Sequence, residues 1–136
     1  GRTGETLTLR GFRNNGQQFR AVAVAGAREA VSAATTVQVS KHASSVKVAG
    51  SKLKAGKSPV VQVRATAAGT ARVQVKVGSK TWTTTVAVAK NRTQNAAFAS
   101  ALPRKAKGNA TITVTFTPNS SDFATAKTVA KVKIKK

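Results

Sequence analysis

Apolar and polar side chains alternate strictly in Thr70-Ala71-Arg72-Val73-Gln74-Val75-Lys76-Val77. The same period of two returns in Thr111-Ile112-Thr113-Val114-Thr115-Phe116-Thr117. A β-strand points successive side chains to opposite faces, so each run predicts an antiparallel strand with one buried and one exposed face. The polar positions hold Thr, Arg, Gln and Lys in the first run and only Thr in the second, and neither run contains an acid.

Further strands are predicted on both sides of these two runs, and glycine or proline separates most of them. The expected strands are Val46–Val48, Val60–Thr66, Thr81–Ala89, Ala97–Leu102 and Thr128–Lys135. Turn signals recur at intervals of about 8 to 12 residues, which is typical of an all-β sandwich. Residues 46–136 are therefore predicted to form one antiparallel β-sandwich of immunoglobulin size.

The inward positions of these strands predict a thin core with many alanines filling the remaining space. Trp82 is assigned to this core rather than to ligand stacking, because aromatic side chains dominate core energetics. The expected core consists of Val46, Val61, Val63, Val73, Val75, Trp82, Val86, Phe98, Leu102, Ile112, Val114, Phe116, Phe123, Val132 and Ile134.

The alanine-rich segment 21–34 has the composition of a helix, but its details favour strands. Val22, Val24 and Val31 are β-branched and therefore stiff in a helix, and Gly26 interrupts the run. No long helical stripe appears elsewhere in the chain, so the whole protein is predicted to be all-β.

Several motifs in residues 44–134 resemble the bacterial Ig-like repeat domains of secreted actinobacterial proteins. The resemblance rests on Gly69–Val75, on Ala101-Leu102-Pro103 followed by Gly108–Phe116, and on Ser120–Ala124 before a valine-rich last strand. It implies an immunoglobulin-like antiparallel sandwich. The chain departs from the family pattern where Phe116 replaces the usual tyrosine and where Lys or Arg replaces acids.

Residues 1–40 resemble the last three strands of a second Ig domain, at Gly4–Leu9, Asn14–Ala21 and Ala33–Val39. Phe19 takes the tyrosine-corner position and Ala21 the cysteine position. Three strands cannot close a sandwich, so a partner is expected to supply the other half. Either the missing half of this N-terminal domain stays bound after cleavage before Gly1, or strands of a neighbouring subunit complete it. Residues 41–45 are then the linker.

The charge of the chain points to an anionic partner. Lys and Arg number 24 against Glu5, Glu29 and Asp122, which gives a net charge of +21 on 136 residues. A charge this large repels itself, and a polyanionic neighbour is the usual reason for tolerating it. The alternative is that scattered lysines keep a secreted domain soluble and protect its strand edges.

The same composition argues against catalysis and cofactors. Three isolated acids and His42 supply neither paired carboxylates nor a triad, and the chain contains no cysteine for zinc, thiol chemistry or disulfides. No metal or other cofactor is therefore expected. No apolar run approaches the about 20 residues of a membrane helix, so no membrane span is expected.

The candidate polyanion-binding residues are the outward cations of three strands expected to share one sheet. Arg72 and Lys76 lie on one flank and Lys131, Lys133 and Lys135 on the other, with Thr113 and Thr115 between them. A second basic group follows Pro103 and consists of Arg104, Lys105 and Lys107. A third basic group follows Gly50 and consists of Lys52, Lys54 and Lys57.

These observations predict a non-enzymatic, basic Ig-like C-terminal region of a larger secreted or cell-surface bacterial protein. Its expected partners are teichoic acid, acidic glycan or extracellular DNA, bound without sequence specificity. A dedicated nucleic-acid module is disfavoured because the few aromatic residues are needed for the core. Two alternatives remain open, a subunit of an extracellular filament built by strand complementation and a passive spacer for an upstream enzyme domain.

Overall fold

The computed structural model describes residues 17–136, and the chain divides into two units, Gly1–Ser40 and Lys41–Lys136. Within the described residues there is no helix, and every ladder between strands is antiparallel. The prediction of an all-β, antiparallel protein is confirmed.

The described part of the first unit is a single β-hairpin. β1 (Gln18–Phe19) pairs with β4 (Thr35–Thr36), and β2 (Val22–Ala25) pairs with β3 (Arg28–Val31). Gly26 has a φ of 60° at the turn, so the predicted break in this segment is confirmed. The expected strand Gly4–Leu9 lies outside the described residues.

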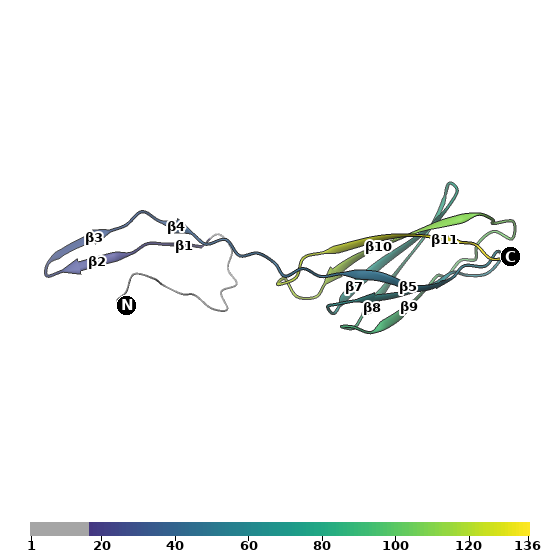
Figure 1. Ribbon diagram of the computed structural model, residues 1–136, viewed down its shortest axis with the longest axis horizontal. Helices are drawn as coiled ribbons and strands as arrows, with labels where there is room; N and C mark the ends of the chain where they lie inside the picture. The colour runs from purple at the N-terminus through teal and green to yellow at the C-terminus, as the bar shows by residue number, and fades with distance from the viewer. Residues whose placement is uncertain (1–16) are drawn as a thin grey trace. The chain divides into compact units, whose positions relative to one another are not determined.

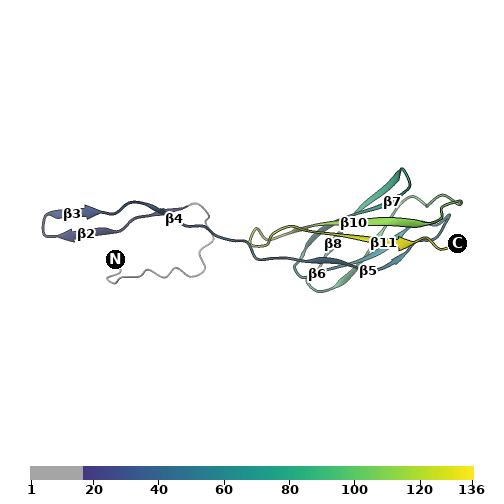
Figure 2. The same ribbon diagram turned by 45° about the horizontal axis from the view of Figure 1, so that its top comes forward.

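The second unit contains seven strands in two sheets (Figure 1). One sheet has the order β11-β10-β7-β8 and the other the order β5-β6-β9. Figure 2 shows the sheet of β5 and β6 running beside β10 and β11. The strands are β5 (Val46–Lys52), β6 (Val60–Ala65), β7 (Gly69–Val77), β8 (Lys80–Val88), β9 (Thr93–Ala97), β10 (Asn109–Pro118) and β11 (Ala126–Lys133).

The core lies between these two sheets and contains most of the side chains predicted from alternation. Of the expected core, only Trp82, Val86, Phe123 and Val132 are partly exposed, and all four pack against the buried cluster. The remaining buried side chains of the core are alanines, which were expected to fill it but were not named individually, together with Leu53 and Val88, which the prediction missed. These are Leu53, Ala65, Ala67, Ala71, Val88, Ala96 and Ala110.

The predicted strand Ala97–Leu102 is wrong. The strand at this point is β9, which ends at Ala97 and pairs with β6. Phe98 and Leu102 are buried from a loop, where their backbone amides donate to the carbonyl oxygens of Pro59 (3.2 Å) and Lys57 (2.9 Å). The apolar side chains of Phe98 and Leu102 resemble the buried positions of a strand. The hydrogen-bonded ladder with β6 instead uses the more polar residues Thr93–Ala97 that precede them.

Residues 41–45, predicted as a linker, are held on the sandwich. The His42 amide donates to the Asp122 carbonyl at 2.7 Å, and the Ala124 amide donates back to the His42 carbonyl at 2.9 Å. The Ser44 hydroxyl donates to the Ala124 carbonyl at 2.6 Å, and the His42 and Phe123 rings lie 5.8 Å apart. This segment therefore behaves as part of the second unit.

Candidate polyanion-binding face

The alternation in β7 divides its side chains between the core and solvent. Val73 and Val75 are fully buried, which turns Arg72, Gln74 and Lys76 to the outer face of the four-stranded sheet. The neighbouring strands follow the same rule, because a strand in register with β7 must bury the residues opposite its valines.

The register aligns the outward residues of adjacent strands into two rows. In one row, Lys76 of β7 lies opposite Thr111 of β10, and Thr111 lies opposite Lys131 of β11. In the other row, Arg72 lies opposite Thr115, which in turn lies opposite Lys127. Each row therefore places one threonine between two cations.

We call the four cations of these rows, Arg72, Lys76, Lys127 and Lys131, the cation rectangle. Residues four apart on one strand are separated by about 13 Å, and strands two apart by about 9.5 Å. The backbone thus sets the spacing of the four Cα positions, and the long side chains can adjust around it. Gln74, Thr113 and Val129 form the row between the two cationic rows.

On β8, the strand next to β7, the outward positions of this face are occupied by threonines. Thr81, Thr83 and Thr85 lie opposite Lys76, Gln74 and Arg72, respectively. Hydroxyl groups can donate to phosphate or carboxylate oxygens, and Lys and Arg add charge-assisted hydrogen bonds. The outward residues of the four strands include no acid, since Asp122 is the only acidic residue in sequence positions 41–136 and lies between β10 and β11.

Four of the predicted site residues, Arg72, Lys76, Lys131 and Lys133, lie on this outer face. Lys135 does not lie on this strand as expected, because β11 ends at Lys133. Ile134 is buried, and the Lys135 backbone pairs with the end of β5 instead, donating to Leu53 at 2.8 Å and accepting from Ala55 at 3.0 Å. Residues just after β5 thus hold the backbone of Lys135 beside the three-stranded sheet.

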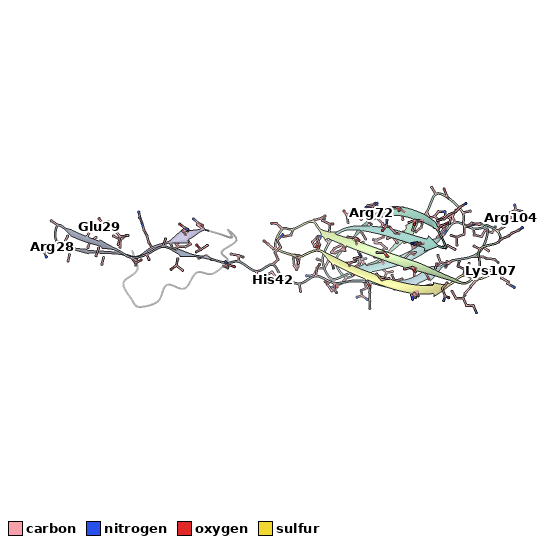
Figure 3. The ribbon with its side chains drawn as sticks, turned by 90° about the horizontal axis from the view of Figure 1, so that it is seen from above. Arg28, Glu29, His42, Arg72, Arg104 and Lys107 are labelled. Carbon is pink, nitrogen blue, oxygen red and sulfur yellow. The ribbon has the colours of Figure 1, made fainter. Side chains whose placement is uncertain are left out.

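The predicted basic loop after Pro103 lies at the end of the sandwich away from His42 (Figure 3). Within it, Lys107 lines an open hollow of about 500 Å³ with Lys133, Lys135, Lys136 and neighbouring residues, which we call the lysine hollow. Arg104 and Lys105 are exposed but do not line this hollow. Lys133 connects the hollow with the outer face of β11.

Two components of the face were missed by the sequence prediction. Lys127 was omitted because the last strand was expected to begin at Thr128, although its spacing from Lys131 by four residues places both on one side of a strand. The threonines of β8 were included in a predicted strand, but only the pairing of β8 with β7 places them beside Arg72 and Lys76.

No protein-family model and no curated protein matches this chain. Among residues 17–136, no helix is long and apolar enough to cross a membrane. The same residues contain no group of three or more His, Cys, Asp or Glu side chains that could hold a metal ion. The charged outer face is the feature of these residues with the clearest capacity to bind a partner.

Proposed function

We propose that the second unit is a non-catalytic, Ig-like module by which a larger secreted or surface bacterial protein attaches to anionic polymers. The observation that carries this proposal is the acid-free outer face with its two rows of cation, threonine and cation. Regularly spaced cations can engage several anionic groups of one polymer at once, so individually weak contacts add up.

The polymers that suit this face carry phosphate or carboxylate groups along a linear chain, as teichoic acids, acidic glycans and DNA do. The face offers no exposed aromatic side chains for stacking, since Trp82 packs against the core. Contacts are therefore expected with the charged backbone of a polymer rather than with bases, and binding should depend strongly on salt.

The test compares two full-length variants of equal charge. The face variant replaces Arg72, Lys76, Lys127 and Lys131 by Gln, and the control variant replaces Lys41, Lys80, Lys90 and Arg92 by Gln. Retention on a poly(glycerol phosphate) matrix and on duplex DNA is measured over a salt series. The face variant should elute at lower salt than the control, and its DNA salt slope should fall by about 0.9 per lost phosphate contact.

Equal elution of the two variants would contradict a binding face. It would mean that retention follows the net charge alone, and it would favour a passive spacer. Retention of one polymer by the wild type above about 0.15 M salt, where screening acts over about 8 Å, would instead identify its ligand class.

A second candidate function, a filament subunit built by strand addition, is favoured by the hairpin of the first unit. Val24 is 69% exposed, and Val22 and Val31, which face each other across the hairpin, are also exposed. In the described residues β2 and β3 pair only with each other, and an isolated two-stranded sheet is marginal in water. Electron microscopy of the concentrated protein should show polymers if a second copy completes this sheet, and discrete particles would exclude it.

A further inference from the structure

Two cations face each other directly on the three-stranded sheet, on the side of the sandwich opposite the cation rectangle. Lys47 of β5 and Arg64 of β6 are register partners, and both are exposed. Like charges at directly opposed positions destabilise a strand pair. The other register partner of Arg64 is Thr93 of β9, which offers no compensating charge.

These two cations line an open hollow of about 300 Å³ together with Ser45, Ala65, Thr66 and Asn91. We call it the β5–β6 hollow. Its lining contains no acid, so nothing in the lining neutralises the two positive charges. An anion bound between Lys47 and Arg64 would attract both side chains and offset the repulsion between them.

The polar groups of this hollow are held by the fold. The Ser45 amide donates to Thr66 Oγ1 at 2.9 Å, and the Thr66 amide donates back to the Ser45 carbonyl at 3.1 Å. Thr66 Oγ1 is thus an acceptor in this pair, and its own hydrogen can be donated to a ligand.

Asn91 is fixed at the rim of the same hollow. It is the only residue other than glycine with a positive φ in the described part of the chain, at 56°. The backbone amide of Asn91 donates to the Ala65 carbonyl at 2.8 Å. A left-handed backbone is uncommon outside glycine but is tolerated by Asn. Asn91 is one of the residues that line the hollow, and its side chain carries two donor hydrogens.

We propose that the β5–β6 hollow binds a single phosphoryl group. Arg64 would supply a forked donor, Lys47 a point charge, and Thr66 and Asn91 neutral donors from separate segments of the chain. Donors arriving from several directions suit the tetrahedral arrangement of phosphate oxygens better than the planar arrangement of a carboxylate. This site does not depend on the polymer-binding role of the opposite face, and with that face it would let one domain hold two phosphate-bearing segments.

The test is a titration of the full, isotope-labelled chain with inorganic phosphate, followed by the amide resonances of Ser45, Thr66 and Asn91. Sodium acetate at matched ionic strength and pH is the control. The three resonances should shift saturably with phosphate, with a dissociation constant of about 1 mM for so few contacts, and should not saturate with acetate. Linear shifts with both anions, or no shift, would overturn the proposal.

Variants separate this site from the opposite face. Arg64→Gln should abolish the saturable shift, Arg64→Lys should weaken binding several-fold because the fork is lost, and Lys127→Gln should leave it unchanged. An unchanged shift in Arg64→Gln, or a loss in Lys127→Gln, would contradict a local site.

Thermal unfolding provides a second readout. Without phosphate, Arg64→Gln should unfold at a temperature no lower than the wild type, because a like-charged pair has been removed. Phosphate should raise the midpoint of the wild type more than that of Arg64→Gln, since a ligand that binds only the folded state stabilises it. Equal phosphate responses would argue against binding at Arg64.

Discussion

Gly69 shows how a single absent side chain permits a close approach inside the sandwich. It begins β7 and lies opposite Pro118 at the end of β10. A Cβ at this position would overlap the Thr117 carbonyl oxygen and lie 2.7 Å from Cζ of the buried Phe116 ring. The backbone of β7 can therefore pack against this ring only because position 69 is glycine.

Gly69→Ala should lower the free energy of unfolding by about 1–3 kcal/mol, because neither the carbonyl nor the buried ring can move without disturbing the core. Urea denaturation of the full chain measures the change. Gly78→Asn is the control, since nothing lies within 4 Å of a Cβ at that turn and Asn tolerates a left-handed backbone. If Gly78→Asn lowered the free energy of unfolding as much as Gly69→Ala, the packing explanation would be contradicted.

At the scale of elements, residues 41–45 act as a strap along the loop between β10 and β11. The reciprocal bonds of His42 with Asp122 and Ala124 form an isolated parallel bridge, and the Ser44 hydroxyl adds a bond to Ala124. The strap fixes the point at which the chain enters β5. It therefore contributes to the stability of the second unit rather than only connecting it to the first.

Ser44→Ala should cost about 1 kcal/mol of unfolding free energy, the usual net value of one hydrogen bond. Chemical denaturation followed by Trp82 fluorescence reports on the second unit, because the only tryptophan of the chain lies there. Ser79→Ala, in the exposed turn between β7 and β8, is the matched control and should change little. If both variants had wild-type stability, the Ser44 hydroxyl would contribute nothing to the stability of the second unit.

At the scale of the whole molecule, the main electrostatic effect is the repulsion among the positive charges of the protein itself. A net charge of +21 is spread over 136 residues, and the cations occupy both outer faces and the ends of the sandwich. Repulsion of this kind destabilises a compact state and keeps molecules apart in solution. Added salt or a bound polyanion relieves it.

The thermal midpoint should rise when sodium chloride is raised from about 0.01 M to about 0.15 M, as the Debye length falls from about 30 Å to about 8 Å. The face variant and the control variant, each with four cations removed, should both show a smaller rise than the wild type. Calorimetry in sodium chloride, which avoids phosphate binding, measures this. A midpoint that falls with salt would mean that attractive charge pairs outweigh the repulsion.

The amino-acid sequence by itself determined six of the seven strands of the sandwich, most of its core and the outward direction of Arg72, Lys76, Lys131 and Lys133. These properties follow from period-two alternation, which is local: a valine that is buried fixes the exposure of its neighbours in the chain. The turn at Gly26 could also be predicted locally, because glycine interrupts the run there and adopts a positive φ at no steric cost.

Only the tertiary structure decided which outward residues become neighbours. The rows of the cation rectangle, the opposition of Lys47 and Arg64, and the departure of Lys135 from β11 all depend on register and sheet order. β9 was misplaced because its ladder is set by the available edge of β6 and not by its own composition. Pairing of this kind joins residues far apart in the chain, and alternation within one strand carries no information about it.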